Sequence, residues 1–509
     1  MKRYGSIYIG TFEISMKIYE IARGGAARNI DTKKKNTAVF HDIYRNHELS
    51  PETVETIIET LSDMQETLKL YKVTAYRVYG SYSLDSAKNI LFVIDQIRLR
   101  LGLTVELMSN SEQRFTTYQV FANLPRTHFD TLTKKSAIML DVGGYSMQLT
   151  LFENGTITTT QHILLGAADI REYAKRLSAK ADYREQIYEM LQKELEAFAN
   201  MYLKDVSPEY LIILNDNASE AVEKYIGPMT DGAYRTADYV KGLGRLLKDN
   251  LYSIQTNISE DPGRDSFYLP ILFLLNAIST ILPSKYVCFP GLDVNDGIVY
   301  DMAVHDRMMK MTHSSEADVI SAARFIARRY GSYEPHLNVL DALGTDIIDT
   351  MKKTSGLSDR DRLIYRVAAI LHDCGKYVSL SNSGENSYRI IVSSEILGLT
   401  HKEREMAAYV ALFNRKDVLL YEELANEFTI EEYVRIVKIL AVLRVTNALD
   451  RSHKQKFKKV KMAIKDSRLV ISIAAEDSIS LEKSLFESKA DFFERTFSIR
   501  PVIHEVQAK

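Results

Sequence analysis

Two segments of the sequence each place a glycine between two strand-like runs. Residues 7–20 and 140–153 superpose without a gap, which pairs Gly10 with Gly143. Each segment begins with an apolar run, turns at the glycine and continues with alternating polarity, the pattern of a β-hairpin. Glycine lets backbone approach a ligand closely because it has no Cβ. A fold that repeats this unit would bring two glycine bends face to face, where their N–H groups could bind a phosphate.

The residues between these two bends alternate between predicted strands and helices. Either bend alone would be interpreted as an ordinary turn, but the match between them favours duplicated lobes. Ser50 and Pro51 predict the start of a helix, because a capping hydroxyl followed by proline is typical of helix N-termini. Residues 73–79 are predicted to form a strand, and a helix is predicted after the Gly80 turn, through Asn89. This alternation is typical of an α/β fold.

The second lobe continues the same alternation. Residues 183–204 are predicted to form a helix capped by Asp182, and residues 211–214 a short buried strand. The most apolar run, residues 267–282, is interrupted by polar residues and by a proline. It is too short and too polar to span a bilayer, so it predicts a buried helix.

The bulk composition is that of a folded protein with several domains. The chain has 509 residues, 46% hydrophobic and 26% charged, with a formal net charge of −2, and this length exceeds a single hydrophobic core. The charge balance argues against specific nucleic-acid binding, although a local basic channel for a polyanion is compatible with it. Cys288 and Cys374 lie far apart, which fits a reducing compartment. The amino-terminal residues alternate in polarity instead of forming a signal peptide. We therefore expect a cytoplasmic protein without membrane association.

Five motifs occur in the order and at the spacing of a known family. Residues 141–146 (DVGGYS) resemble the second phosphate loop of the exopolyphosphatase / guanosine pentaphosphate phosphatase family, part of the actin-like ATPase superfamily. Residues 105–114 (VELMSNSEQR) resemble the segment that carries this family's proposed catalytic base. Residues 80–89, 164–167 and 290–301 are similar to three further elements. The resemblance extends from the N-terminus to about residue 500.

This resemblance implies a hydrolase that releases terminal phosphate from inorganic polyphosphate or guanosine pentaphosphate. Attack by water in a cleft between the lobes would be assisted by Mg²⁺, with no organic cofactor. Glu112 would be the catalytic base that orients or deprotonates the water, and Asp141 would hold the Mg²⁺. The expected phosphate-binding residues are Gly10, Thr11, Gly143, Gly144 and Ser146. The family is often described as dimeric, so a homodimer is also expected.

Four positions depart from the family's pattern. Tyr8 stands in place of the first-loop aspartate, and Asp85 in place of an arginine. In the second loop, Tyr145 replaces a glycine and Gln148 a metal-orienting glutamate. Because phosphate sites depend on positive charge, Asp85 changes the local charge by about two units in the unfavourable direction. The alternative function is therefore a catalytically weak protein that binds polyphosphate or an alarmone and regulates another process.

From about residue 304 the sequence changes to long amphipathic helices. His336 opens one predicted helix, and residues 366–376 form another that contains His372 and Asp373. A distant histidine with a His-Asp pair resembles the signature of HD phosphohydrolases, in which these side chains share metals that activate water. His336, His372 and Asp373 are therefore candidate metal ligands. A metal phosphohydrolase acting through this domain is a further alternative.

Later ligands of that signature are missing from the sequence. Three asparagines stand where such sequences often have ligands: Asn386, Asn414 and Asn447. Asp450 can substitute for the last of them only if it lies on the same helix face as Asn447. The incomplete set favours a structural or substrate-channel role. The basic run at residues 451–461 is either a solvated linker or part of a groove for polyphosphate.

The predicted fold class is α/β, with two actin-like (ribonuclease H-like) lobes, then an all-α HD-like domain and a small α+β domain. The predicted domain boundaries are 1–125, 126–303, 304–455 and 456–509. Within the last domain, the sequence predicts a hairpin, a helix and a strand over residues 460–475, 481–497 and 498–506.

Overall fold

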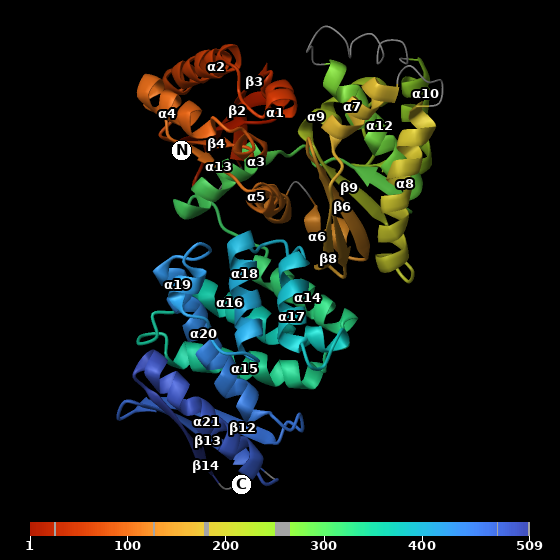
Figure 1. Ribbon diagram of the computed structural model, residues 1–509. Coiled ribbons are helices and arrows are strands. Elements are labelled where there is room, and N and C mark those ends of the chain that lie inside the picture. The colour runs from red at the N-terminus through yellow and green to blue at the C-terminus, as the bar shows by residue number, and fades with distance from the viewer. Residues whose placement is uncertain (25–26, 126–127, 178–182, 250–264, 476, 507–509) are drawn as a thin grey trace. The chain divides into compact units, whose positions relative to one another are not determined.

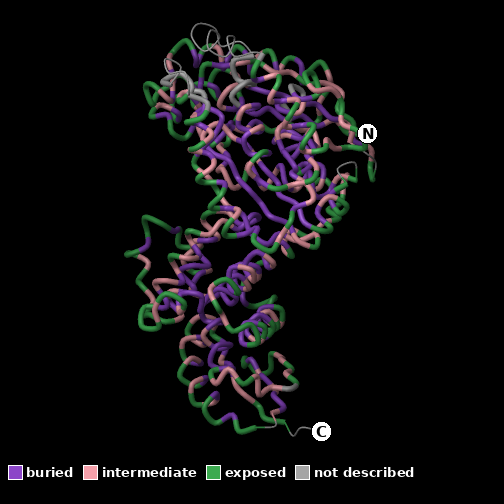
Figure 2. The backbone as a smooth tube through the Cα atoms, turned by 90° about the vertical axis from the view of Figure 1, so that its right-hand side faces the viewer, coloured by how far each residue is buried: buried purple, intermediate pink, exposed green. Residues whose placement is uncertain are grey.

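The computed structural model describes residues 1–24, 27–125, 128–177, 183–249, 265–475 and 477–506 (Figure 1). Two compact units make up the chain, Met1–Ser315 and Glu316–Lys509. Each unit has its own interior, and buried residues gather along the central strands and the inner sides of the helices (Figure 2).

The first lobe of the amino-terminal unit contains a five-stranded sheet with the order β3-β2-β1-β4-β5. Strands β1, β2 and β3 pair antiparallel, while β4 and β5 add in parallel on the other side of β1. The strands are β1 (Lys2–Ile9), β2 (Glu13–Ile21), β3 (Ala27–Asn36), β4 (Ala75–Gly80) and β5 (Val105–Leu107). The helices are α1 (Val39–Asn46), α2 (Pro51–Leu70), α3 (Tyr82–Asp85), α4 (Ile90–Leu101) and α5 (Asn110–Asn123).

The second lobe repeats this sheet. Its order is β10-β11-β9-β6-β7-β8, so β8-β7-β6-β9-β11 matches the first sheet in order and direction, and β10 is an added edge strand. The strands are β6 (Ser136–Val142), β7 (Met147–Glu153), β8 (Thr156–Ile163), β9 (Tyr210–Leu214), β10 (Tyr234–Arg235) and β11 (Tyr286–Cys288). The helices are α6 (Phe129–Thr133), α7 (Ala167–Leu177), α8 (Tyr183–Tyr202), α9 (Asp216–Ile226), α10 (Thr236–Asp249) and α12 (Asp265–Ile281). The predicted duplication is confirmed.

After the second lobe, the chain returns to the first. Helix α13 (Val294–His305) packs against β1, β2, β4 and α5. It begins with a capping box between Asp293 and Asp296, which satisfies backbone N–H groups that have no partner inside the helix. The last helix of this unit therefore belongs in space to the lobe formed by the first residues of the chain.

Helix α2 begins as predicted, with Ser50 accepting a hydrogen bond from the Thr53 N–H and Pro51 at the first position. The helix predicted through Asn89 is wrong, because α3 ends at Asp85 and residues 86–89 form a turn before α4. The Asn89 side chain accepts a hydrogen bond from Leu49 N (3.0 Å) and donates one to Leu49 O (2.8 Å). This long-range clamp holds the turn.

The carboxy-terminal unit consists of a helical part and a small sheet. Its helices are α14 (Ser315–Arg329), which starts at the unit boundary, α15 (Glu334–Thr350), α16 (Asp359–Leu371), the 3₁₀ helix η2 (Cys374–Tyr377), α17 (Ser383–Ser393), α18 (His401–Phe413), α19 (Tyr421–Leu424) and α20 (Ile430–Leu449). Then follow β12 (Phe457–Lys465), β13 (Arg468–Ala475), α21 (Ser480–Phe497) and β14 (Arg500–Glu505). The sheet has the order β12-β13-β14, so the predicted hairpin, helix and strand are confirmed.

Residues 267–281 of the predicted apolar helix lie in α12, where Leu272, Leu274 and Leu275 are fully buried, and Leu282 follows the helix. Across the described ranges, no helix has both the length and the apolarity needed to cross a membrane. The predicted helix cap Asp182 lies outside the described residues.

Candidate functional site

The two glycine bends have the same hydrogen bond. Gly10 N donates to Glu13 O, and Gly143 N donates to Ser146 O, both at 2.9 Å. A Cβ on Gly10 would lie 2.9 Å from Glu13 O, and one on Gly143 would lie 3.2 Å from Ser146 O. Both bends therefore favour glycine for the same steric reason.

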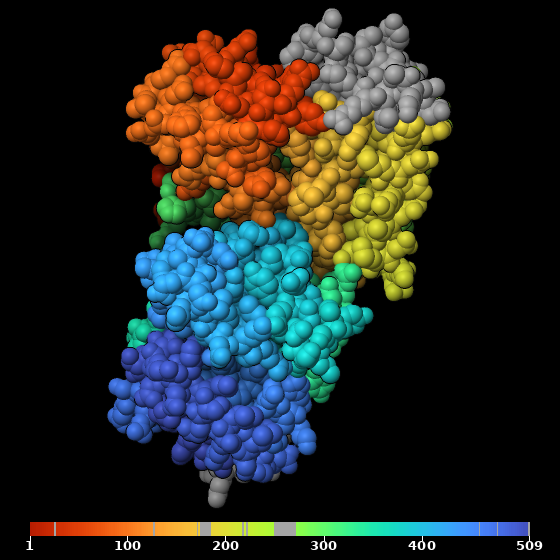
Figure 3. Space-filling view, viewed as in Figure 1, coloured from red at the N-terminus to blue at the C-terminus, as the bar shows by residue number. Residues whose placement is uncertain are grey.

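The bends face each other across the two lobes. A Cβ on Gly144 would lie 3.3 Å from Thr11 Cγ2 and 3.4 Å from the Phe12 ring. The ring of Phe40 lies 5.2 Å from that of Phe12 and 5.7 Å from that of Tyr145, so Tyr145 packs in an aromatic cluster that spans the lobes. The space-filling view shows the red and orange surface of the first lobe in contact with the yellow surface of the second lobe (Figure 3). The structure thus brings the predicted phosphate-binding residues together.

The start of α7 supports the second bend. Ala167 N donates to Gly143 O (3.1 Å), and Ala168 N donates to Gly144 O (2.7 Å). Gly166 precedes them in such close contact that a Cβ would lie 2.2 Å from Gly144 O. The motif at residues 164–167 therefore supports the second bend through backbone contacts. The first N–H groups of α7, which have no partner inside the helix, donate to the carbonyls of the bend.

Polar side chains of the first lobe line the first bend. The Thr11 hydroxyl lies 2.8 Å from that of Ser83, in helix α3, which follows β4. Tyr8 donates its hydroxyl hydrogen to Gln113 on α5. Burial and the nearby negative charge of Asp141 raise the pKa of Tyr8, which keeps this phenol neutral. Tyr8 and Asp141 therefore lie near each other, as the first-loop and second-loop positions of a shared site should.

Arg114 is the cation that reaches the second bend. Its guanidinium donates to Ser146 Oγ (2.8 Å) and to Gln148 Oε1 (3.3 Å), and its side chain is buried. Burial raises the pKa of Asp141, while Arg114 opposes that rise. Arg114 lies within the motif at residues 105–114, but it was not among the predicted site residues. The sequence signal that could have indicated Arg114 is its position two residues after Glu112, the expected catalytic base.

Glu112 lies at the exposed start of α5. Its carboxylate accepts hydrogen bonds from Ser109 N (2.9 Å) and Ser109 Oγ (2.7 Å) and forms the capping box of this helix. The next two residues, Gln113 and Arg114, reach Tyr8 and Ser146. Glu112 therefore stands at the helix end that faces the bends, with a structural role of its own. Asp85 is exposed at the end of α3.

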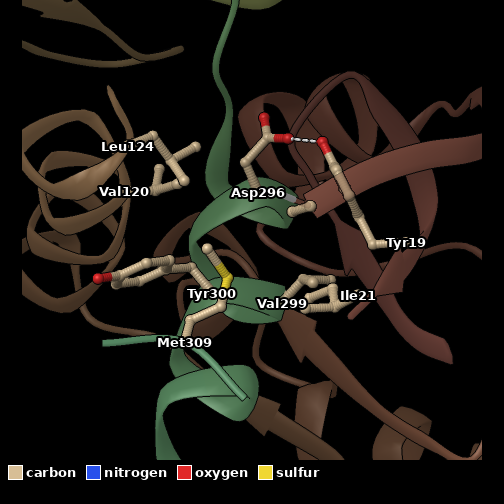
Figure 4. A pocket seen from close by; sticks show the side chains of 9 residues that line it. Tyr19, Ile21, Val120, Leu124, Asp296, Val299, Tyr300 and Met309 are labelled. Carbon is tan, nitrogen blue, oxygen red and sulfur yellow. Dashed lines mark hydrogen bonds between the residues drawn. The ribbon is translucent and has the colours of Figure 1, made fainter. Parts of the chain in front are cut away.

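A buried lysine anchors α13 beside Tyr8. Lys17 Nζ lies 3.1 Å from Asp293 Oδ2 and 3.0 Å from Asp296 Oδ2, and the charge of Asp293 also raises the pKa of Tyr8. Figure 4 shows the Tyr19 hydroxyl directed at Asp296, at the edge of a small pocket. The rest of its lining is apolar apart from the Tyr300 phenol: Ile21, Ala27, Val120, Leu124, Val299 and Met309. Such a lining does not suit a polyanion.

The three candidate metal ligands of the helical part lie close together. His336 is near the start of α15, whereas His372 and Asp373 follow the end of α16, which corrects the helix predicted through residue 376. His372 Nε2 is 3.3 Å from Asp373 Oδ2, and the rings of His336 and His372 are 5.5 Å apart. Burial tends to raise the pKa of Asp373, but His372 and Lys376 lower it overall.

Two further residues complete this group: Asp450, which the sequence analysis considered as a substitute ligand, and His453, which it did not consider. His453 stacks on His336 with a ring separation of 3.8 Å, and ligand atoms of His336, Asp373 and His453 lie within 4.8 Å of one another. Asp450, at the C-cap of α20, lies 2.8 Å from His336 Nδ1. Burial, together with His336 and Lys376, lowers the pKa of His453 to about 4. The sequence analysis missed His453 because it lies in a run interpreted by its charge alone.

One cation of that basic run has a structural partner. Lys456 Nζ lies 2.9 Å from Glu482 Oε2, and the Glu482 side chain is almost fully buried. A buried carboxylate requires such a partner. This lysine therefore ties the loop after α20 to α21, whereas the function of the remaining cations in the run stays a prediction.

Two family descriptions match separate parts of the chain. Residues 18–223 match the Ppx/GppA phosphatase family, and residues 332–490 match domain III of the Ppx/GppA phosphatases. The chain belongs to the Ppx/GppA phosphatase family. The predicted family is confirmed, and so is the predicted enzyme class, a hydrolase. The predicted fold class, two repeated α/β lobes followed by a helical part and a small α+β part, is confirmed as well.

Several proteins of known sequence or structure resemble this Ppx/GppA member at low identity. The guanosine-5'-triphosphate,3'-diphosphate pyrophosphatase of Photobacterium profundum is 19% identical over 481 residues, which cover 93% of this chain and 92% of the relative. The protein of the same description from Aeromonas hydrophila is 20% identical, with 86% of each chain covered.

Two solved structures cover a smaller share of the chain. The Aquifex aeolicus Ppx/GppA family member is 16% identical, with a TM-score of 0.47, over 62% of this chain and 99% of that one. An exopolyphosphatase from Cytophaga hutchinsonii is 15% identical, with a TM-score of 0.48, over 61% and 100%.

Proposed function

We propose that this protein hydrolyses phosphoanhydride bonds, releasing terminal phosphate from inorganic polyphosphate or guanosine pentaphosphate between the two lobes. The observation that carries the proposal is the contact between two glycine bends with the same hydrogen bond, next to Asp141 and Arg114. Backbone N–H groups and a guanidinium are the donors that phosphoryl oxygens prefer. The names of the two relatives described above, which are nucleotide pyrophosphatases, support the same reaction class.

In the proposed reaction, each group has a role suited to its chemistry. The bends and Ser146 would hold the oxygens of the terminal phosphoryl group, and Arg114 would neutralise part of the charge. Glu112 would accept the proton of the attacking water, while the bond from phosphorus to the bridging oxygen breaks and the shortened chain leaves. Because Arg114 now donates to Ser146, it must turn part of its fork toward the substrate.

Mg²⁺ is the metal that suits this site. Mg²⁺ sites commonly use one or two carboxylates together with substrate phosphates and water, and Asp141 supplies one carboxylate. Arg114 favours the ionised form of Asp141 against the effect of burial. Asp141 would therefore hold the ion together with the substrate, and the ion would supply positive charge to the phosphoryl oxygens.

A phosphate-release assay with Mg²⁺ tests the proposal, using long-chain polyphosphate and guanosine pentaphosphate in parallel. Glu112→Gln is expected to lower the rate about 100-fold or more, while the capping box persists because glutamine also serves at this position. Glu432→Gln is the matched control. Glu432 also accepts a backbone hydrogen bond at 2.9 Å in a capping box, at the start of α20, and its change should leave the rate unaltered.

The remaining outcomes distinguish the alternatives. Suppose that His372→Ala loses phosphate release while Glu112→Gln retains it in full. The reaction would then take place in the helical part, and the proposal that it takes place between the lobes would be refuted. Wild-type protein that releases no phosphate from either substrate would also refute it. Tight polyphosphate binding in that case identifies a regulator.

One observation favours the regulatory alternative. Tyr8 occupies the expected carboxylate position and binds Gln113, so the first bend lacks the negative charge that would share a metal with Asp141. A site with one carboxylate binds metal more weakly than a site with two, which would slow turnover more than binding of the polyanion.

A further inference from the structure

His336 has the hydrogen-bonding pattern of a metal ligand. Its Nδ1 lies 2.8 Å from Asp450 Oδ2, while its Nε2, in a side chain that is 1% exposed, has no hydrogen-bond partner among the described residues. Metal-binding histidines commonly donate one ring N–H to a carboxylate and coordinate through the other nitrogen. A buried polar atom without a partner costs free energy unless something occupies it.

His372 repeats this arrangement. Its Nδ1 bonds the backbone carbonyl of Ala369 at 2.8 Å, and within the described part of the chain its buried Nε2 has no hydrogen-bond partner. That nitrogen lies 3.3 Å from Asp373 Oδ2. The Nε2 of His336 thus lacks a hydrogen-bond partner among the described residues, and the Nε2 of His372 lies beside the carboxylate of Asp373, an arrangement that a hydrophobic core would not require.

A strained loop brings the third histidine to the cluster. His453 has a φ of 56° and Gln455 a φ of 47°, a left-handed conformation that is uncommon outside glycine. Asp450 holds this loop, because its carboxylate accepts from Gln455 N (2.9 Å) and Gln455 Nε2 (3.2 Å) in addition to pairing with His336. Backbone strain of this kind persists at binding sites. Asp450 therefore orients both His336 and the loop that carries His453.

Asp373 retains room for an ion although two cations bind it. Lys376 pairs with Oδ2, and Arg415 donates to Oδ1 at 3.0 Å. A carboxylate has about four lone-pair sites, so each oxygen can still coordinate. Lys376 and Arg415 offset the charges of Asp373 and Asp450. A divalent ion would therefore make the cluster positive, and its open coordination position would favour an anion.

We propose that the helical part binds one divalent transition-metal ion through His336, Asp373 and His453, with Asp450 as a positioning residue. Two imidazoles and a carboxylate suit Zn²⁺ and similar ions better than Mg²⁺, which prefers oxygen ligands. Three protein ligands leave a position open for water or an anion. This site is separate in sequence and chemistry from the phosphate site of the lobes.

The test measures metal in the full chain. Protein stripped with a chelator, loaded with Zn²⁺ and dialysed should retain about one ion per chain by elemental analysis. His336→Gln and His453→Gln should each lower Zn²⁺ affinity at least tenfold. Asp450→Asn should lower it by about 10–100-fold while the full stoichiometry is still reached at high Zn²⁺. His401→Gln is the matched control, because His401 is an exposed histidine on α18 that lies 3.3 Å from Glu405.

Co²⁺ provides a second measurement that does not depend on any variant. Co²⁺ bound to the wild-type chain should show the intense visible bands of a four- or five-coordinate site instead of the weak bands of the hydrated ion. Wild-type protein without stoichiometric Zn²⁺ or without these bands would overturn the proposal. So would full Zn²⁺ retention in both histidine variants. Phosphate release by wild type and Glu112→Gln is scored separately, so failure of this site leaves the lobe site unaffected.

Discussion

The two candidate sites differ in how their polar groups are satisfied. In the lobes, Tyr8 binds Gln113 and Arg114 binds Ser146, whereas the Tyr145 hydroxyl and Gln148 Nε2 have no hydrogen-bond partner among the described residues. In the helical part, His336 and His372 each use one ring nitrogen, and over the ranges that the structure describes the other has no hydrogen-bond partner. A paired site must exchange its own bonds for those of a ligand, whereas a site with unpaired nitrogens is already organised to receive one.

This difference concerns the cost of binding. Opening the lobe site releases hydrogen bonds that each contribute about 0.5–1.5 kcal/mol, or more where a charge takes part. A substrate with many phosphates can offset that loss with many new contacts. In the histidine cluster, the free-energy cost is already present without a ligand, because buried nitrogens lack hydrogen-bond partners in the free protein. We therefore expect substitutions in the lobes to affect packing and charge, and substitutions in the cluster to affect metal affinity.

The largest effect on stability is expected from Gly166→Ala, which disrupts the packing of the start of α7 against the second bend. The new methyl group would lie 2.2 Å from Gly144 O and 2.5 Å from Ser146 N, so the second bend must move. Overpacking of this kind costs about 1–3 kcal/mol. Differential scanning calorimetry should show the lower stability, and phosphate release should fall more than tenfold. Gly244→Ala, where a Cβ meets nothing within 4 Å on α10, should be neutral or stabilising.

Local patterns in the sequence predicted the frame of the lobe site. A glycine between an apolar run and an alternating run specifies a hairpin without reference to distant residues, and both hairpins are present with the same Gly N–H bond. The repeat then predicted that two sheets share one topology. By contrast, the turn at residues 86–89 depends on the bond between Asn89 and Leu49, a partner 40 residues away that helix propensity does not include.

The polar partners of both sites were hidden for the same reason. Arg114 is recognised as a site residue by its hydrogen bond to Ser146, 32 residues later in the chain. His336 is recognised by its contact with Asp450, 114 residues later. His453 reaches the cluster through a left-handed loop, a conformation that its basic surroundings in the sequence do not indicate. Motif order could place Glu112 and Asp141 as candidates, and the spacing of Ser109 and Glu112 was the signal for the capping box that the structure shows.

An intermediate effect is expected from Tyr8→Asp, which gives the lobe site a second carboxylate that can bind a metal ion. The change removes the partner of Gln113 and places a second carboxylate near Asp141. Without Mg²⁺, repulsion between the two carboxylates should lower stability by about 1–2 kcal/mol. Millimolar Mg²⁺ should restore much of it, because two carboxylates bind the ion better than one.

Tyr8→Asn is the control for that experiment, since it loses the same ring and the same hydrogen bond without adding charge. Its melting temperature should not respond to Mg²⁺. An equal Mg²⁺ response in both variants would mean that the ion binds elsewhere, and that Tyr8 and Asp141 do not form one site.

The smallest effect concerns the pH dependence of stability at Asp141. Burial raises the pKa of this carboxyl despite the opposing charge of Arg114, so the folded protein binds the proton more tightly than the unfolded chain. Such a group destabilises the folded state at neutral pH, and the penalty disappears as the pH falls below the unfolded value of about 3.9. In Mg²⁺-free buffer, Asp141→Asn should therefore melt slightly higher than wild type at pH 7, with the difference shrinking toward pH 4.

The control for this comparison is Asp130→Asn, an exposed carboxylate in the first turn of α6, whose melting temperature should track wild type across the same pH range. A lower melting temperature for Asp141→Asn at pH 7 would reverse the interpretation, because Asp141 would then stabilise the fold as a charge partner of Arg114. In that case Arg114 would neutralise Asp141 in the lobe site, and no negative charge would remain to attract a metal ion. A higher melting temperature leaves Asp141 as a carboxylate whose desolvation cost a bound cation can offset.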